Sequence, residues 1–421
     1  DLLSSKSFSE VNKMAEKSKK PAIRFAGFTD AWEQRKLGEL GTTFTGLSGK
    51  SKGDFGHGDA RFITYMNVFS NPIADLSMTE SVEIDFKQNC VTQGDVFFTT
   101  SSETPEEVGM SCVMPENIDN MYLNSFCFGY RPIEKFDLSY LAYALRSTTF
   151  RKGIIFLAQG ISRYNISKNK AMDLEISVPS LEEQGCIGRY FNHLDNLITL
   201  HQRKYDKLVN VKKAMLEKMF PKDGADVPEI RFKGFTEAWE QRKLGDIVDR
   251  VVRKNTNNES MLVLTISAQY GLVDQITYFN NRVASRDVSN YFLVLNGEFA
   301  YNKSTSDGYP FGAVKRLDLY DKGVLSTLYI VFVPKSKLII NSNFLTVFFD
   351  TDRWYKGVSE RAAEGARNHG LLNISAEDFF DIDIVISKYI EEQKQIGELF
   401  RSFDNLITLH QRKLEKLKNL K

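Results

Sequence analysis

The chain contains two copies of one unit, and this duplication limits the possible folds more than any other feature. Residues 24–40 (RFAGFTDAWEQRKLGEL) and 231–247 (RFKGFTEAWEQRKLGDI) are identical at 13 of 17 positions. The string DNLITLHQRK stands at residues 195–204 and again, unchanged, at residues 404–413. Two such matches in the same order do not arise by chance, so the 421 residues form two tandem units of about 208 residues. Length alone would suggest about three domains.

Between the shared blocks the two copies have diverged, but they keep a sparse common pattern. Residues 93–95 (QGD) match residues 296–298 (NGE), and the string NIS stands at both 165–167 and 373–375. This favours one fold that carries two different recognition surfaces. The alternative is an old duplication whose middle segments drifted freely, which does not explain why the flanking blocks stayed nearly identical.

The two middle segments, residues 41–180 and 248–390, are rich in Val, Ile, Phe, Tyr and Thr in short runs separated by Gly, Asn, Ser and Asp. Such runs predict strands joined by turns. Short helices are predicted at residues 139–146 and 352–363, so each middle segment is predicted to be an α+β domain. The predicted strands lie at 61–68, 94–100 and 174–179 in the first segment, and at 261–267, 298–302, 325–334, 345–350 and 381–387 in the second.

The shared block at residues 182–219 predicts a long helix with one apolar seam. Apolar or ring-bearing side chains recur there in alternating steps of four and three residues, which is the coiled-coil spacing. Pro179 and Pro221 bracket this helix as breakers, and its polar faces are expected to face solvent. The seam residues are Ile187, Phe191, Leu194, Ile198, His201, Tyr205 and Leu208 in the first copy, and Ile396, Phe400, Phe403, Ile407, His410, Leu414 and Leu417 in the second.

Two such helices, each following a globular segment, can cover one another's seams as an antiparallel coiled coil. The predicted architecture is therefore α+β, with two tandem mixed α/β domains separated by two long helices and related by a pseudo-two-fold axis. The predicted segments are an N-terminal extension (1–23), a first domain (24–180), a central helix (181–220), a linker and second domain (221–390), and a distal helix (391–421).

The arrangement resembles the specificity (S) subunits of type I restriction–modification systems, and the resemblance covers about residues 20–421. In that family a target-recognition domain opens after a motif like WEQRKLGE, seen here at residues 32–39 and again at 239–246 as WEQRKLGD. The domain closes with a stretch like ISVPSLEEQ, residues 176–184, answered by ISKYIEEQ at 386–393. The second stretch lacks the proline, which blurs that boundary. A Gram-positive bacterial source is also predicted.

The resemblance implies a cytoplasmic subunit with no catalysis of its own. Each target-recognition domain would read one half of a bipartite, asymmetric target in double-stranded DNA, and the helices would set the gap between the halves. Two modification subunits, which use S-adenosylmethionine to methylate adenine N6, would dock on the conserved helices. Two restriction subunits, which use ATP and Mg to translocate and cut DNA, would complete the enzyme. No cofactor and no metal are expected in this chain, and no membrane contact.

The residues themselves also point away from catalysis. The GKS string at residues 49–51 has Phe44 where a phosphate-binding loop needs glycine, and residues 71–73 (NPI) fail the N/D-P-P-Y/F motif of adenine methylases. A self-contained methyltransferase or nuclease is therefore disfavoured, and a coiled-coil scaffold without DNA is disfavoured by the strand-rich domains. Four cysteines without close pairing predict reduced thiols, namely Cys90, Cys112, Cys127 and Cys186.

Charge is unevenly divided along a chain whose formal net charge is +1. Residues 41–160 hold 9 Lys/Arg against 14 Asp/Glu, whereas residues 248–372 hold 15 against 12. Since phosphate neutralisation supplies most non-specific affinity for DNA, the first domain cannot bind DNA tightly by bulk charge. Partner subunits are expected to hold much of the DNA backbone.

Base readout needs polar side chains presented into the major groove, and two loops in each domain carry them. The first loop follows the strand that begins with Gly-Asp or Gly-Glu. For this loop, a DNA-reading role and an ordinary polar turn are equally supported. The second has a glycine shortly before an arginine in both copies (residues 160–165 and 365–369), three residues before Arg163 and two before Arg367. There DNA contact is favoured over a surface ion pair. The candidates are Thr99, Thr100, Ser101, Ser102, Asn302, Lys303 and Ser304 in the first loop, and Arg163, Tyr164, Asn165, Arg367 and Asn368 in the second.

Six further cations outside these loops are weaker candidates for DNA contact. They are Lys50, Lys52 and Arg61 in the first domain and Arg282, Arg286 and Arg361 in the second. Among the five histidines, His201 and His410 occupy equivalent seam positions. We expect them to pack and hydrogen-bond within the helix pair, with register setting or partner contact as the minority interpretation.

Overall fold

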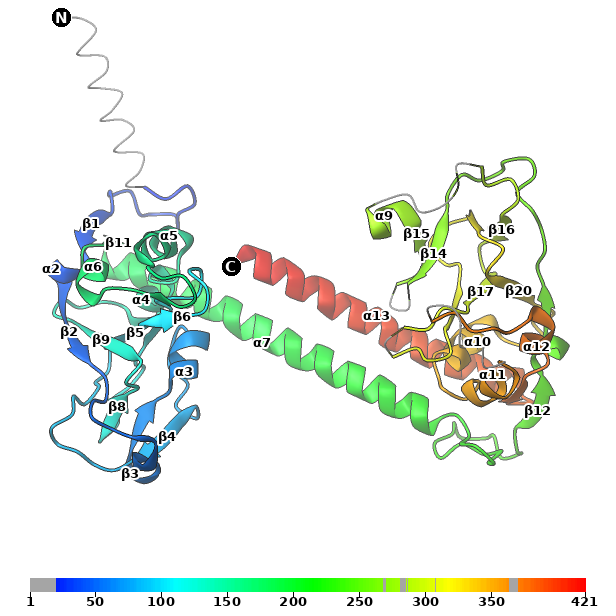
Figure 1. Cartoon of the computed structure of the whole chain (residues 1–421), viewed down its shortest axis with the longest axis horizontal. Helices are drawn as coiled ribbons and strands as arrows, with labels where there is room; N and C mark the ends of the chain where they lie inside the picture. The colour runs from blue at the N-terminus through cyan, green and yellow to red at the C-terminus, as the bar shows by residue number, and fades with distance from the viewer. Residues whose placement is uncertain (1–19, 268–269, 281–284, 286, 307, 363–369) are drawn as a thin grey trace, which may run out of the picture. The chain divides into compact units, whose positions relative to one another are not determined.

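The computed structural model describes residues 20–267, 270–280, 285, 287–306, 308–362 and 370–421 (Figure 1). The chain divides into two compact units. Unit 1 comprises the chain up to Thr199 together with Leu417–Lys421, and unit 2 comprises Leu200–Lys416. Each unit mixes helices and strands, so the α+β class predicted from the sequence is confirmed.

Unit 1 is built around an antiparallel four-stranded sheet with a core on each face. Val96 and Phe98 pack with helix α4 (Leu138–Ala144) and helix α5 (Thr148–Leu157) on one face, whereas Phe97 belongs to the core on the other. This alternation follows the two-residue period of a strand. The strand order is β2 (Gly41–Thr45), β9 (Cys127–Pro132), β5 (Val96–Thr99) and β7 (Ser111–Val113).

Unit 2 repeats this sheet in the same order with different side chains. Phe299, Tyr301 and Phe332 are fully buried in its main core. The QGD and NGE segments shared by the two copies lie immediately before the third strand of each sheet in this order, so the sparse pattern in the sequence marks equivalent turns. The strand order is β13 (Val248–Arg250), β20 (Ile330–Pro334), β17 (Phe299–Asn302) and β18 (Ala313–Arg316).

The shared WEQRK blocks form strands that bring distant parts of each unit together. In unit 1, β1 (Glu33–Lys36) pairs with β11 (Glu175–Val178), and in unit 2, β12 (Glu240–Lys243) pairs with β21 (Asp383–Ile386). An arginine eight residues before each WEQRK string forms a bidentate ion pair with a buried glutamate in the first turn of a long helix. Arg24 binds Glu183 at 2.6 and 2.7 Å, and Arg231 binds Glu392 at 2.6 and 2.9 Å.

The prediction of a strand at residues 345–350 is wrong, because most of this segment lies in helix α10 (Ser342–Phe349). Its aromatic residues favour a strand locally, but Leu345, Phe348 and Phe349 recur at helical spacing and are all buried in one core. The side chain of Asn341 caps the helix by accepting a hydrogen bond from the Phe344 N–H. The predicted strand at 61–68 likewise ends early, since helix α3 (Tyr65–Ser70) begins within it.

The two long helices predicted from the repeat are formed as α7 (Leu181–Lys218) and α13 (Ile390–Leu420). Within unit 2 they run antiparallel, since His201 contacts His410 at 2.8 Å between Nδ1 atoms and Lys212 Nζ lies 2.6 Å from Asp404 Oδ1. Every predicted seam residue is buried or half-buried, and the coiled-coil role of these residues stays a prediction.

The histidine pair predicts an acid-sensitive contact. Burial lowers the pKa of both His201 and His410, and nearby Lys204 and Lys413 lower it further. Because the pKa of each histidine in the folded chain lies below the unfolded value of 6.5, the folded state favours the neutral ring. The contact therefore stabilises the fold fully above pH 6.5, and this stabilisation is lost as the pH falls towards the folded pKa. Two protonated rings would also lose the shared hydrogen bond, because neither Nδ1 could then accept.

We therefore expect the melting temperature to fall between pH 7.5 and pH 5, and to fall less when both histidines are replaced by leucine. Thermal unfolding across this pH range checks the expectation. The exposed His193→Asn on α7 is the control and should keep the pH dependence of the unsubstituted chain. An unchanged pH dependence in the double leucine variant would contradict the assignment.

Candidate nucleic-acid interface

The structure joins the two predicted reading loops of unit 1. Strand β6 (Ser101–Ser102) pairs with β10 (Tyr164–Asn165), although the two lie more than 60 residues apart in the sequence. The side chain of Arg163 donates to Ser101 Oγ at 3.3 Å. The second loop is closed on itself by the two backbone hydrogen bonds between Gln159 and Asn165, each 2.9 Å long. The loops thus form one joined edge with a fixed register.

Unit 2 joins its first loop to residues 370–372, which follow the predicted second loop; that loop (365–369) lies outside the described residues. The Thr305 N–H donates to the Gly370 carbonyl at 2.6 Å, and the Leu372 N–H donates to the Lys303 carbonyl at 3.0 Å. The Lys303 ammonium also reaches the Ile374 carbonyl at 3.4 Å. The sequence placed two candidate loops in each copy, and the junction between the two loops of unit 1 is a property of the fold.

A third loop, which sequence reasoning missed, presents an apolar side chain at equivalent positions of the two units. Phe126 is 59% exposed and Leu328 is 61% exposed. In each case a polar residue two positions earlier accepts a hydrogen bond from the backbone N–H of the exposed residue, Asn124 at 2.8 Å and Ser326 at 3.2 Å. The Phe126 carbonyl accepts two bonds from Thr100, so this loop borders the joined edge.

Two further apolar side chains stand beside the second loop in unit 1. Ile161 is 96% exposed within it, and Phe156 is 88% exposed near the end of α5. Apolar groups can contact the methyl group of thymine or wedge against a base step. Single exposed apolar residues carry no signal in a sequence, because only the fold reveals that they are exposed.

The expectation of a solvent-exposed polar loop at residues 99–102 is wrong for three of its four residues. Thr99 ends the central strand β5 and is fully buried, and its hydroxyl accepts the Met110 N–H at 3.0 Å. Ser101 and Ser102 are buried in β6, and the Ser102 hydroxyl is bonded to Glu107. These hydroxyls hold the edge together. Thr100 is half-buried and donates to the Phe126 carbonyl.

The second loop presents the best-placed reader of unit 1. Arg163 and Asn165 are exposed and Tyr164 is half-buried, so the guanidinium can reach a partner outside the chain. In unit 2, Ser304 is exposed, and Asn302 and Lys303 are half-buried. The DNA contacts of these six residues stay predictions. Arg282, Arg286, Arg367 and Asn368 lie outside the described residues.

The remaining candidate cations differ in how firmly the chain holds them. Lys50 pairs with Asp85 at 2.9 Å and, together with the backbone N–H of Lys87, lowers the pKa of that carboxyl to about 2. Arg361 is mostly buried and makes an ion pair with Asp381 at 2.8 Å, so both cations are weaker reader candidates than the sequence suggests. Arg61 donates to Thr79 twice. Lys52 is exposed and has no ion pair in the described part of the chain.

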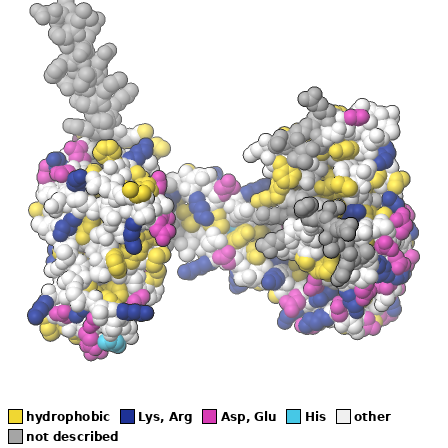
Figure 2. Space-filling model, in the orientation of Figure 1, with side chains coloured by type: hydrophobic (Ala, Val, Ile, Leu, Met, Phe, Trp, Pro, Cys, Tyr) yellow, Lys and Arg dark blue, Asp and Glu magenta, His cyan; other side chains and the backbone are white. Residues whose placement is uncertain are grey.

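The visible surface of each unit interleaves the two signs of charge. Figure 2 shows Lys and Arg side chains alternating with Asp and Glu over both units. Among the described residues, no group of three or more His, Cys, Asp or Glu side chains is placed to hold a metal ion. No helix in that part of the chain is long and apolar enough to cross a membrane. The four cysteines are free, and burial raises the pKa of the Cys112 thiol to about 12.

Comparison with known families gives one match that covers most of the chain. The profile described as "Type I restriction modification DNA specificity domain" matches residues 29–210 and again residues 236–419. The two matched regions correspond to the two copies found in the sequence. Each includes the three loops of one unit and a large part of one long helix.

Individual relatives agree with the family match. The putative type I restriction enzyme MjaX specificity subunit of Methanocaldococcus jannaschii is 26% identical over 227 residues, which cover 51% of this chain and 52% of that protein. The MjaVIII specificity subunit of the same organism is 25% identical over 299 residues, or 67% of each chain. The crystal structure of a type I restriction–modification S subunit from M. genitalium shares the fold, with a TM-score of 0.57 and 13% identity over 95% of this chain and 96% of that one.

Proposed function

Because the chain belongs to the type I restriction modification DNA specificity family, we propose that it selects the DNA target of a type I restriction–modification enzyme. One observation carries the proposal. Each unit builds a joined edge and exposes an apolar side chain at an equivalent position, with Arg163 and Phe126 in unit 1 and Lys303 and Leu328 in unit 2. The same backbone arrangement with different side chains suits the reading of two different half-sites, since base identity is read by side chains that reach the groove.

We further propose that the chain catalyses nothing and works inside a larger enzyme in the cytoplasm. Two modification subunits would bind S-adenosylmethionine and methylate adenine N6, and two restriction subunits would use ATP and Mg. The exposed side chains of Leu200 and Leu409, which occupy equivalent positions in the repeated DNLITLHQRK string, support a docking role for both long helices. The 38 residues of α7 span about 57 Å, a length that would set the gap between half-sites.

The function is tested by mixing the chain with a modification subunit and S-adenosylmethionine, and by mapping the adenines that become methylated. Methylation of one bipartite target is expected only when both proteins are present. Methylation by this chain alone would support the self-contained methyltransferase instead. Unchanged target choice when the chain is omitted would support a scaffold without DNA recognition.

Within this assembly, Arg163→Ala is expected to weaken binding to the mapped target by roughly 1–3 kcal/mol if the guanidinium contacts a base. Phe126→Ala should weaken the same half-site, and Arg367→Ala should act on the other. Phe86→Ala removes a phenyl ring that is 91% exposed outside the joined edge and is the matched control. Titration of labelled duplexes by fluorescence anisotropy measures the effect. Equal affinities in the arginine variants and the control would exclude these loops as readers.

A further inference from the structure

Unit 1 contains a pocket, lined by both apolar and polar side chains, that the proposed function does not use. Its volume is about 660 Å³. Aromatic and aliphatic side chains line it together with polar and charged ones, among them Arg146, Glu175 and Lys421. The side chains of Trp32, Tyr140, Ala144, Ile187 and Phe191 form much of its wall.

The equivalent place in unit 2 is filled by the two residues that directly follow α7, Met219 and Phe220. The ring of Phe220 lies 5.8 Å from Trp239, 5.6 Å from Phe344 and 6.5 Å from Phe400, measured between centroids. Phe220 and the preceding Met219 are buried in the main core of unit 2. The segment that directly follows α7 is therefore an integral part of that core.

The two places correspond residue by residue. Trp32 and Trp239 occupy the same position of the shared WEQRK block, and Phe191 and Phe400 the same position of the shared helix. Tyr140 and Phe344 each donate a backbone N–H to the cap residue of their helix, Asp137 or Asn341. Each cap residue in turn donates its own N–H to the equivalent glutamine, Gln184 or Gln393. The pocket of unit 1 is thus lined by the counterparts of the rings that enclose Phe220.

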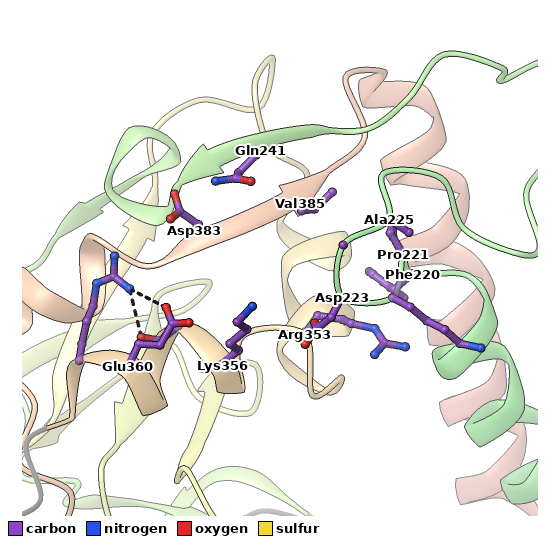
Figure 3. Close-up of a pocket in the computed structure, with 14 residues that line it drawn as sticks. Phe220, Pro221, Asp223, Ala225, Gln241, Arg353, Lys356, Glu360, Asp383 and Val385 are labelled. Carbon is purple, nitrogen blue, oxygen red and sulfur yellow. Dashed lines mark hydrogen bonds and ion pairs between the residues drawn. The ribbon is translucent and has the colours of Figure 1, made fainter.

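The space left in unit 2 is smaller because α7 and the loop after it occupy the rest. A pocket of about 220 Å³ remains there. Figure 3 shows Phe220, Pro221 and Arg353 on one side of it and Gln241 and Asp383 on the other. Gln34 and Glu175, the counterparts of the last two residues, line the larger pocket of unit 1.

An equivalent ion pair lies beside the pocket of unit 1 and beside the Phe220 site of unit 2, and it aligns the two long helices in the same way at each. In unit 2, Lys212 of α7 binds Asp404, and in unit 1, Lys421 binds Asp195. The two aspartates are the first residues of the two DNLITLHQRK strings. Phe220 follows Lys212 by eight positions, so a helix continuing from Lys421 in this register would deliver its eighth residue to the pocket.

We propose that the pocket of unit 1 is a receptor for an apolar helix end with adjacent Met and Phe side chains, entering in line with α13. The occupant is defined by the chemistry that fills the counterpart in unit 2, namely a phenyl ring among aromatic rings with a methionine beside it. The proposal does not depend on DNA recognition.

The test extends the full chain after Lys421 by the nine residues KAMLEKMFP, which are residues 213–221 of the chain itself. We expect the melting temperature to rise by roughly 4 °C or more as the rings are covered. We also expect acrylamide quenching of tryptophan fluorescence to fall. Trp239 and Trp354 are already buried, whereas Trp32 is half-buried, so quenching reports mainly on Trp32.

The control extension is KAMLEKSSP, which replaces only the methionine and phenylalanine of the helix end. Its melting temperature and quenching should match those of the unextended chain. The proposal is overturned if the two extensions change both quantities equally, or if neither changes them. A gain that is specific to KAMLEKMFP, and that Phe191→Ala reduces, would support it.

Discussion

Replacing Glu392 by alanine is expected to destabilise unit 2 by about 3–5 kcal/mol, because it leaves a mostly buried guanidinium without its partner. Glu392 is fully buried and binds Arg231 through both carboxylate oxygens. It also accepts a hydrogen bond from the Ser387 hydroxyl. This cluster ties the segment before β12 to the start of α13.

Urea denaturation, followed by the fluorescence of the buried Trp239 and Trp354, measures this loss. The neighbouring Glu391→Ala is the matched control, since Glu391 is exposed and, among the described residues, makes an ion pair with Lys394 alone, on the surface of the helix. It should change stability by no more than about 0.5 kcal/mol. If the two alanine variants unfold at the same urea concentration, the buried pair does not have the role assigned to it.

The second large effect is expected from lengthening both long helices together. We would insert seven residues directly after His201 and seven directly before His410. Because these two histidines face each other in the antiparallel pair, the two insertions lie side by side and preserve the seam spacing. The insertion adds about 10 Å to each helix, which corresponds to about three base pairs at roughly 3.4 Å each.

The lengthened subunit, assembled with modification subunits, should methylate the native target at least roughly 100-fold more slowly, because the reacting adenine is misplaced. A duplex library in which only the gap between half-sites varies should reveal a different preferred gap. Inserting the seven residues into α7 alone should break the register with α13 and give no new preferred gap. An unchanged gap preference in the doubly lengthened subunit would contradict the proposal that the helices set the spacing.

Local and repeated patterns in the sequence predicted the parts of the fold that depend on periodicity. The seam of α7 and α13 follows from a spacing of three and four residues, since that spacing places all seam residues on one helix face. The pairing of His201 with His410 follows from their equivalent seam positions. The double domain follows from the duplication itself, because two nearly identical blocks must occupy equivalent environments.

The tertiary structure decided what depends on contacts between distant residues. Segment 345–350 is a helix because its buried face matches a core built from other strands and helices, and this environment outweighs strand propensity. Thr99 is buried because β5 is a central strand flanked by β7 and β9. Lys50 is held by a carboxylate 35 residues away. Exposure and ion pairing are properties of the folded surface, so a sequence can place candidate readers in loops but cannot say which remain free.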